Sequence, residues 1–232
     1  MRAVIFDLDG TLIDSLPDVM KALNAVLEHN DRRPLSTSET RSMIGGGADV
    51  LLQNAFKATG SPLPHDNVIS CVEAFTSHYL SDHTSENRLF DGVRSALKIL
   101  SAQDTKLGVC TNKPQKMALS ILKSLELDAH IPVCIGKGQL PYHKPDRRHY
   151  DEVVAALGVA VHQSLYVGDS ETDVETARNA GVPLILVSHG YSKNPASMLG
   201  ADRLIGHFSE LPKVVDQLFA AMKCAAPKTG LV

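Results

Sequence analysis

The strongest constraint on the fold is a repeating order of short apolar runs and amphipathic segments. Each run has the length of a strand, and each following segment carries apolar residues at helical spacing. Strand followed by helix, repeated, predicts an α/β fold in which helices cover both faces of a parallel sheet. The predicted strands are 3–8, 106–111, 132–135, 164–167, 183–187 and 203–205. The predicted helices are 93–102, 115–125, 147–157, 171–180, 195–199 and 210–223.

One region breaks this alternation. From residue 15 to about residue 84 the apolar residues follow helical periodicity alone, as in Val19, Leu23 and Val26. Roughly 70 residues are too many for a loop and enough for a small helical bundle. We therefore expect an inserted helical cap domain, 15–84, in a core domain formed by 1–14 and 85–232. Its connections should lie next to Asp14 and near 85–87, and residues 225–232 should form a frayed tail.

The composition excludes several classes of function. The 232 residues are 44% hydrophobic, which suits a globular core. Lys and Arg number 23 against 26 Asp and Glu, and the formal charge of −3 gives no electrostatic argument for nucleic acid or an anionic membrane. The apolar runs fall far short of the ~20 residues that span a bilayer. The first predicted strand begins within three residues of the start, so we expect no signal peptide. We expect a cytoplasmic protein.

The first predicted strand ends in two acidic residues, Asp7 and Asp9, followed by Gly10. Because strand residues i and i+2 project to one side, both carboxylates should face the same crevice. Neighbouring carboxylates repel each other, and Mg²⁺ held by one or two carboxylates and a substrate phosphate would remove that cost. A capping Asp followed by an Asp-Gly turn would produce the same residues.

Polar residues also follow other predicted strands. Thr111 and Asn112 precede a helix whose N-terminal amides attract anions, Lys144 lies in a later loop, and Asp169 and Asp173 are one helical turn apart. Taken singly, each has an ordinary alternative as a helix cap or a solvated surface residue. Together they mark strand ends of one parallel sheet, where α/β folds carry their sites. The set therefore favours one shared site.

These motifs resemble those of the haloacid dehalogenase-like hydrolase superfamily, which implies a Rossmann-like core. The matching residues are Asp7-Leu8-Asp9-Gly10-Thr11, Thr111, Lys144-Pro145, and Gly168-Asp169 with Asp173. The lid directly after the first motif is similar to the helical cap of the phosphatase and mutase branch. Three further segments resemble bacterial phosphoglycolate phosphatases: Ile44-Gly45-Gly46-Gly47-Ala48-Asp49, Thr111-Asn112-Lys113-Pro114 and Ser188-His189-Gly190-Tyr191.

The resemblance implies a Mg²⁺-dependent phosphatase for a small phosphate monoester, with 2-phosphoglycolate as the leading substrate. Asp7 would be the nucleophile that forms an aspartyl-phosphate, and Asp9 would serve as acid and base. Mg²⁺ would be held by Asp7, the backbone carbonyl of Asp9 and Asp169. Asp173 would orient Lys144 or a metal-bound water. The groups expected to bind the phosphoryl oxygens are Thr111, Asn112 and Lys144.

The glycines of the cap are the expected substrate contacts. Gly45, Gly46 and Gly47 align backbone N–H groups without side-chain obstruction, so this loop should close over a small carboxylated substrate. Arg41 is expected to add positive charge there. The same glycines would also serve simply to separate two cap helices, since Gly commonly ends helices.

Two departures from the family pattern stand out. Arg147 replaces the second proline that often follows the motif lysine, so Asp146 should begin the helix as its cap. The segment 136–141 lacks the acidic pair usual in phosphoglycolate phosphatases and is mildly basic.

Other functions share parts of the pattern. A β-phosphoglucomutase-like phosphotransferase or another sugar-phosphate phosphatase would carry all four motifs, although Gly46-Gly47-Ala48 offers no cation for a second phosphate. Asp9 and Asp169 argue against a dehalogenase. A phospho-accepting receiver-type module also combines acidic residues, Thr and Lys, but it is about half this length and has no lid. Monomer and homodimer both remain open.

Overall fold

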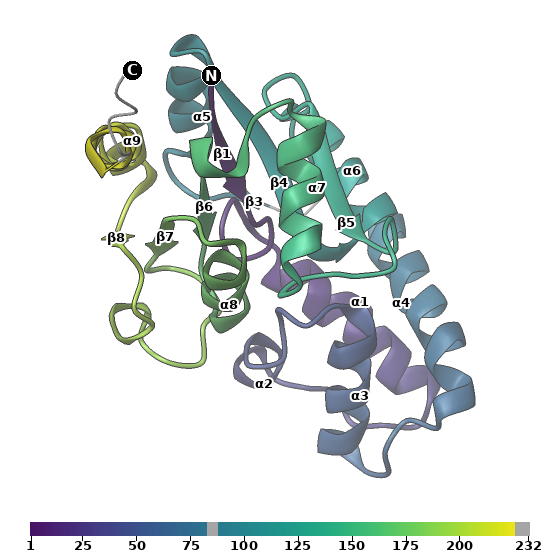
Figure 1. The fold of residues 1–232 in the computed structure, drawn as a ribbon. Helices are drawn as coiled ribbons and strands as arrows, with labels where there is room; N and C mark the ends of the chain where they lie inside the picture. The colour runs from purple at the N-terminus through teal and green to yellow at the C-terminus, as the bar shows by residue number, and fades with distance from the viewer. Residues whose placement is uncertain (83–87, 226–232) are drawn as a thin grey trace.

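The computed structural model describes residues 1–82 and 88–225. Figure 1 shows a twisted sheet with its helices, and a group of helices beyond one edge of that sheet. The sheet has six strands in the order β5-β4-β1-β6-β7-β8, and every neighbouring pair is parallel. The strands are β1 Arg2–Phe6, β4 Thr105–Pro114, β5 Val133–Lys137, β6 Ser164–Gly168, β7 Leu184–Val187 and β8 Arg203–Ile205. The expected α/β fold is confirmed.

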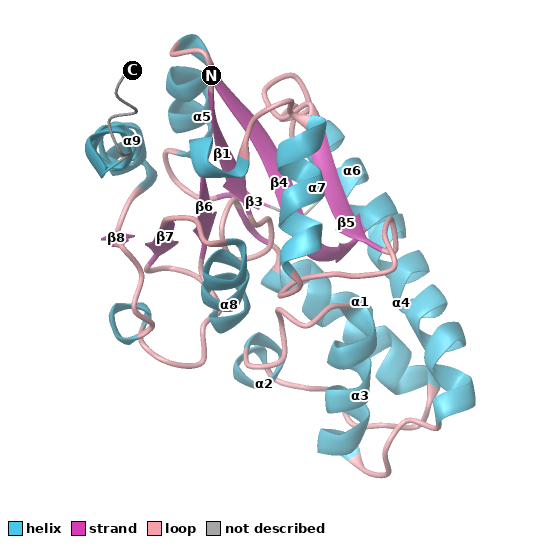
Figure 2. Ribbon diagram, in the orientation of Figure 1, coloured by secondary structure: helices cyan, strands magenta, loops and turns pink. Residues whose placement is uncertain are grey.

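Helices cover both faces of the sheet because its strands are apolar on both sides (Figure 2). Val4 and Phe6 of β1 pack into one core with three helices, whereas Ala3 and Ile5 point into a second core with two others. The first set is α5 Val93–Ala102, α6 Gln115–Ser124 and α9 Leu211–Ala225; the second is α7 Arg147–Ala156 and α8 Glu171–Ala180. Alternate residues of the buried strand thus pack against the helical layers on opposite faces of the sheet.

Local sequence explains how the helices of the second layer begin. Asp146 accepts a 2.9 Å hydrogen bond from the backbone N–H of Arg148 and caps α7, as expected. Ser170 and Asp173 form a capping box at the start of α8. The predicted helix at 195–199 is wrong: only a single 3₁₀ turn, Ala196–Met198, forms there. An isolated turn of this kind is common in connections between larger elements.

Four helices among the described residues lie in the region without strand periodicity, and we call this group the cap. They are α1 Leu16–His29, α2 Thr37–Arg41, α3 Ala48–Thr59 and α4 Val68–Asp82. A short antiparallel pair, β2 Ile13–Asp14 with β3 Arg88–Leu89, joins the cap to the sheet. The first helix of this group, α1, begins two residues after Asp14. The expected second connection near 85–87 and the tail 226–232 lie outside the described residues.

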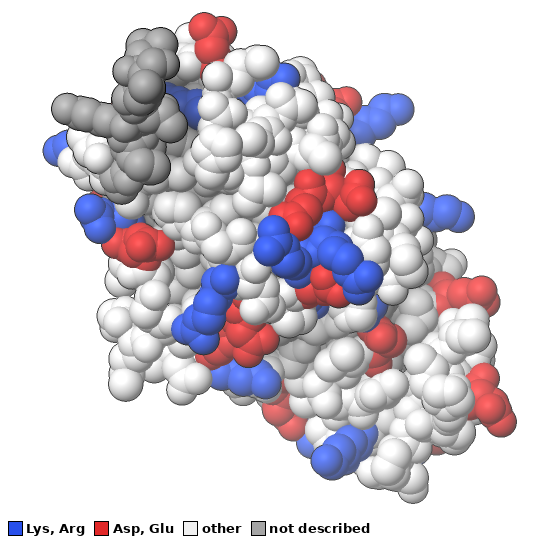
Figure 3. Space-filling model, in the orientation of Figure 1, with Lys and Arg blue, Asp and Glu red and all other residues white. Residues whose placement is uncertain are grey.

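The remaining short elements are the 3₁₀ turns His65–Asn67, Val161–Gln163 and Phe208–Glu210. In the part of the chain that the structure covers, no helix is both long enough and apolar enough to cross a membrane. On the face in Figure 3, acidic and basic side chains are intermingled. The exposed pairs Arg147–Asp151 and Arg148–Asp146, for example, are joined at 2.9 and 2.6 Å.

Candidate active site

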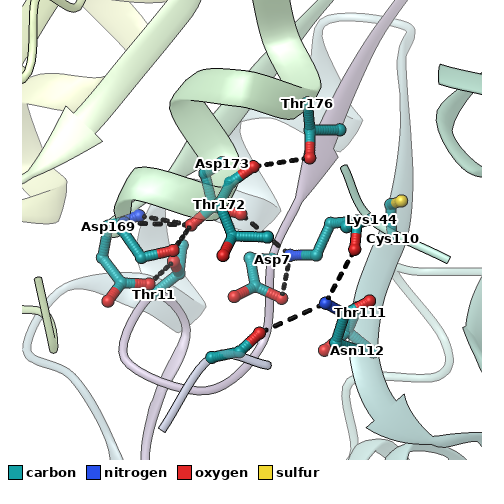
Figure 4. A network of polar contacts seen from close by, with 12 residues as sticks. Asp7, Thr11, Cys110, Thr111, Asn112, Lys144, Asp169, Thr172, Asp173 and Thr176 are labelled. Atoms are coloured by element: carbon teal, nitrogen blue, oxygen red, sulfur yellow. Dashed lines mark hydrogen bonds and ion pairs between the residues drawn. The ribbon is translucent and has the colours of Figure 1, made fainter. Parts of the chain in front are cut away.

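The polar residues predicted from four strand ends meet at the carboxyl edge of the sheet (Figure 4). Asp7 directly follows β1, and its backbone N–H donates to Val167 of β6. Thr111 and Asn112 belong to the end of β4, and Asp169 follows β6. Lys144 reaches the same point from the loop before α7. Parallel pairing of adjacent strands brings these ends together.

Lys144 is the centre of the charge network. Its Nζ lies 2.8 Å from Oδ1 of Asp7 and 2.8 Å from Oδ1 of Asp173. It also donates a 2.9 Å hydrogen bond to the hydroxyl of Tyr166. Burial acts to lower the pKa of Lys144, but the attraction of Asp173 and Asp7 outweighs it and raises that pKa. The ammonium therefore stays charged inside the protein.

Asp173 is held from several sides. Its Oδ2 accepts hydrogen bonds from the backbone N–H groups of Asp169 and Ser170, both at 3.0 Å, and from the Ser170 hydroxyl at 2.7 Å. Burial opposes ionisation, but the ammonium of Lys144 and these donors lower the pKa of Asp173. The carboxylate is thus fixed as the partner of Lys144.

Three carboxylates form an acidic cluster: one oxygen each of Asp7, Asp169 and Asp173 lies within 4.8 Å of the others. Burial raises the pKa of Asp7 to about 6, against the lowering effect of Lys144. Burial, together with the charges of Asp173 and Asp7, also raises the pKa of Asp169. A single ammonium does not balance three buried carboxylates, so the donor set fits a divalent cation.

The position of Asp169 is set by two hydrogen bonds. The Thr11 hydroxyl donates to its Oδ1 and the backbone N–H of Tyr191 donates to its Oδ2, both at 2.7 Å. Gly10 has a φ of +83° and packs against this carboxylate, where a Cβ would lie 2.5 Å from Oδ2. The turn after β1 therefore requires glycine.

Asp9 points to a different partner from Asp7. Its Oδ1 lies 2.8 Å from Nζ of Lys113. Lys113 comes from β4, its side chain is 3% exposed, and its Nζ lies 4.2 Å from the centroid of the Tyr79 ring on α4. The expected metal set included Asp9 through its backbone carbonyl, whereas the side-chain cluster contains Asp173 in addition to Asp7 and Asp169.

The C-terminal end of β4 is hydrogen-bonded to the loop between α2 and α3 that contains Gly45, Gly46 and Gly47, here called the cap loop. The Asn112 side-chain amide donates to the carbonyl of Lys144 at 3.1 Å and to that of Gly45 at 3.2 Å. The Thr111 hydroxyl accepts a 3.2 Å hydrogen bond from the backbone N–H of Lys113. Asn112 thus bridges the core and the loop that was expected to contact the substrate.

A cleft that is partly open to solvent lies between this edge and the cap. Its polar wall comes from the core and its apolar wall largely from the cap helices α1, α3 and α4. The described lining residues are Asp7, Asp9, Val19, Ile44, Gly45, Gly47, Ala48, Leu51, Phe75, Thr111, Asn112, Lys113, Pro114 and Met117. Two of the three cap-loop glycines are among them.

The other predicted cap residues have different contacts. Arg41 donates to the carbonyls of His189, at 3.2 Å, and Gly190, and its guanidinium carbon lies 5.3 Å from the centroid of the Tyr191 ring. The Gly46 carbonyl accepts a 3.3 Å hydrogen bond from Lys137 of β5. In this structure neither Arg41 nor Gly46 is among the residues that line the cleft.

Sequence reasoning missed three residues that connect the site. Lys137 also pairs with Asp49 of the cap at 2.6 Å. The Tyr191 hydroxyl donates to Asp14 at 2.6 Å and accepts from the backbone N–H of Ser15 at 2.9 Å, where the chain enters the cap. Lys113 is the third, and here a signal existed: it lies two strand positions after Thr111 and so projects to the same side.

The chain is similar to known proteins over most of its length. Residues 4–187 match the model of haloacid dehalogenase-like hydrolases, and the chain belongs to this family. It is 40% identical over 228 residues to a phosphoglycolate phosphatase of Caulobacter vibrioides. The alignment covers 98% of this chain and 95% of the relative. It is also 40% identical over 214 residues to a phosphoglycolate phosphatase of Rhodospirillum rubrum. That alignment covers 90% of this chain and 89% of the relative.

A solved structure has a similar fold. The crystal structure of a predicted phosphoglycolate phosphatase from Haemophilus somnus superposes with a TM-score of 0.87 and 30% sequence identity, covering 93% of this chain and 98% of that one. These similarities leave the receiver-type module, the non-enzymatic alternative, without support.

Proposed function

We propose that this chain is a phosphatase that hydrolyses 2-phosphoglycolate to glycolate and phosphate through an aspartyl-phosphate on Asp7. The observation that carries the proposal is the contact between Asp7 Oδ1 and Lys144 Nζ, 2.8 Å apart beside a buried acidic cluster. A carboxylate is a competent nucleophile for phosphorus when a cation lies beside it. The 40% identity to two phosphoglycolate phosphatases supports the substrate.

Mg²⁺ fits the donor set at this point. It would be held by Asp7, Asp169 and the backbone carbonyl of Asp9, while Asp173 keeps its bonds to Lys144 and Ser170. Oxygen ligands and a substrate phosphate are the usual surroundings of this ion. When bound, it would screen the negative charge of the phosphoryl group from the carboxylates.

Two side chains of the first motif, Asp7 and Asp9, carry out the nucleophilic attack and the proton transfers. A carboxylate oxygen of Asp7 attacks phosphorus, the bond from phosphorus to the glycolate oxygen breaks, and Asp9 gives its proton to that oxygen. Asp9 then takes a proton from water, whose oxygen attacks phosphorus and displaces the Asp7 carboxylate. Glycolate and inorganic phosphate leave, and both aspartates return to their starting states.

Residues from the other strand ends bind the phosphoryl group. The ammonium of Lys144 and the hydroxyl of Thr111 would stabilise charge on the transferring oxygens. Asn112 would contribute its backbone N–H, because its side-chain amide is bonded to the carbonyls of Lys144 and Gly45. Asp173 would hold Lys144 in position through their 2.8 Å contact.

The cap would close the cleft during the reaction. In this proposal residues 1–14 and 85–232 form the catalytic core domain, and residues 15–84 form the cap. Gly45 and Gly47 already line the cleft opposite Asp7 and Asp9. Closure would exclude water and place the backbone N–H groups of the loop against a short anionic substrate.

The experiment is a comparison of kcat/KM across a panel of phosphate monoesters with Mg²⁺ and with excess EDTA. We expect the highest value for 2-phosphoglycolate and no turnover in EDTA. A clear preference for glucose phosphates would assign a sugar-phosphate phosphatase instead. Interconversion of glucose phosphates without release of phosphate would assign a phosphotransferase, and either result would overturn the proposal.

A further inference from the structure

The proposed substrate, 2-phosphoglycolate, carries two anionic groups, and the cationic side chain of Lys144 can neutralise one of them. Its phosphoryl group lies with Asp7, Thr111 and Lys144, but its carboxylate must also enter the cleft. Burying a carboxylate without a partner is strongly unfavourable. The cleft therefore needs a second cation near the leaving oxygen.

Lys113 is the one cation among the described residues that line the cleft. Arg41 donates to the carbonyls of His189 and Gly190, and Lys137 pairs with Asp49. The cap side of the cleft near Lys113 is apolar, with Leu51 and Phe75. An ammonium in such surroundings is poorly screened by water, which strengthens its attraction for an anion.

Lys113 also lies next to Asp9, the proposed acid. An acid that protonates the glycolate oxygen must lie within hydrogen-bond reach of it. In 2-phosphoglycolate a single methylene carbon separates that oxygen from the carboxylate. Because Nζ of Lys113 lies 2.8 Å from Oδ1 of Asp9, a substrate oriented for proton transfer brings its carboxylate close to Lys113.

We propose that Lys113 binds the carboxylate of the substrate and makes the enzyme specific for short phosphate esters with a second anionic group. This inference rests on the proposed function. An ammonium has three N–H donors, which lets Lys113 hold Asp9 and a carboxylate together. The centroid of the Tyr79 ring lies 4.2 Å from Nζ, and a cation–π contact of this kind favours the charged ammonium.

The test uses 2-phosphoglycolate and ethyl phosphate, in which a methyl group replaces the carboxylate. We expect Lys113→Met to lower kcat/KM for 2-phosphoglycolate about 10- to 100-fold, as for the loss of a charge-assisted hydrogen bond. Ethyl phosphate makes no contact with the ammonium and shares only the loss that arises through Asp9. The ratio of kcat/KM for 2-phosphoglycolate to that for ethyl phosphate should therefore fall about 10-fold or more. Lys113→Arg should retain most of the preference for the carboxylated substrate.

Equal losses on both substrates would overturn the inference, because Lys113 would then act only through Asp9. Lys137→Met is the matched control: it removes another partly buried lysine at the same edge and should change both substrates by the same factor. Thermal unfolding confirms that each variant folds, and Lys113→Gln gives the same comparison if Met at this position prevents folding.

The two proposals fail differently. A wild-type enzyme without preference for 2-phosphoglycolate over ethyl phosphate would refute the proposed substrate. A wild-type preference that persists in Lys113→Met would refute the role of Lys113 alone.

Discussion

Lys144 and Asp173 form an ion pair in which Nζ and Oδ1 are 2.8 Å apart and the two side chains are 2% and 0% exposed. The pair joins the loop before α7 to the first turn of α8. Transferring both charges from water is costly, and the hydrogen bonds from Tyr166 and Ser170 offset part of that cost. The stability of the site therefore depends on both partners being present.

Replacing the lysine should be destabilising as well as inactivating. Lys144→Met leaves Asp7 and Asp173 without their cation, and we expect the free energy of unfolding in urea to fall by about 3–5 kcal/mol. Lys106→Met is the control, because Lys106 donates a 2.6 Å hydrogen bond to the carbonyl of Leu157 and, within 1–82 and 88–225, has no ion-pair partner. Its loss should cost about 1 kcal/mol. Equal effects of the two substitutions would contradict this account of the pair.

We expect Mg²⁺ binding at the acidic cluster to stabilise the folded protein. Because Asp7, Asp169 and Asp173 repel one another, Mg²⁺ should raise the thermal midpoint of the wild-type protein as its concentration rises. Asp169→Ala should remain folded in EDTA, lose activity and show little response to Mg²⁺. Differential scanning calorimetry with and without Mg²⁺ measures this, and an unchanged Mg²⁺ response in the variant would argue against Asp169 as a ligand.

We expect the ion pair between Lys137 and Asp49 to help hold the cap over the core. Their atoms are 2.6 Å apart, and Gly47 leaves room for the lysine, since a Cβ there would lie 2.9 Å from Nζ. Asp49 is partly exposed, so the pair should add no more than about 1 kcal/mol to stability. We expect Lys137→Met and Asp49→Asn each to lower kcat/KM several-fold through weaker closure.

A double-mutant cycle on kcat/KM checks that the two residues act together. The double variant should lose little more activity than either single variant, because each substitution removes the same interaction. Additive losses would show that Lys137 and Asp49 act independently of each other.

The sheet and the catalytic edge could be predicted from sequence because strand ends are local features. Asp7 and Asp169 each follow an apolar run directly, and parallel pairing fixes their meeting point. β4 extends past the predicted end at Thr111 to Pro114, because its pairing with β5 shifts register after Cys110. Such an irregularity depends on the neighbouring strand and leaves no periodic signal.

Contacts between the cap and the core were beyond prediction from sequence. Lys137 and Asp49 are far apart in the chain, and the direction of Arg41 toward His189 and Gly190 depends on how α2 docks. Neither follows from local spacing, because long side chains on a helix or loop have several accessible directions.

Because His149 is buried, we expect the folded protein to lose stability in acid. Nδ1 of His149 accepts a 3.1 Å hydrogen bond from the backbone N–H of Lys144, and its Nε2 lies 3.1 Å from the carbonyl of Ile135. Burial, followed by the charge of Lys144, lowers the pKa of His149 from 6.5 to about 4. The neutral ring therefore stabilises the folded state above pH 6.5, and this contribution is lost as the pH falls toward 4.

Urea unfolding at a series of pH values tests this expectation. Between pH 6.5 and 4, His149→Gln should lose less stability than the wild type, because its side chain does not titrate. His162→Gln, at an exposed position, should keep the wild-type pH dependence. The same pH dependence in all three proteins would contradict the role assigned to His149.

Trapping the phosphoenzyme tests the central claim most directly. The wild-type protein is mixed with 2-phosphoglycolate and Mg²⁺, quenched in acid during turnover and mapped by mass spectrometry of its peptides. The account predicts a single phosphoryl group on the carboxylate of Asp7, and neither phosphoenzyme nor turnover in a folded Asp7→Asn variant. A phosphoryl group on another residue, or wild-type turnover by Asp7→Asn, would contradict it.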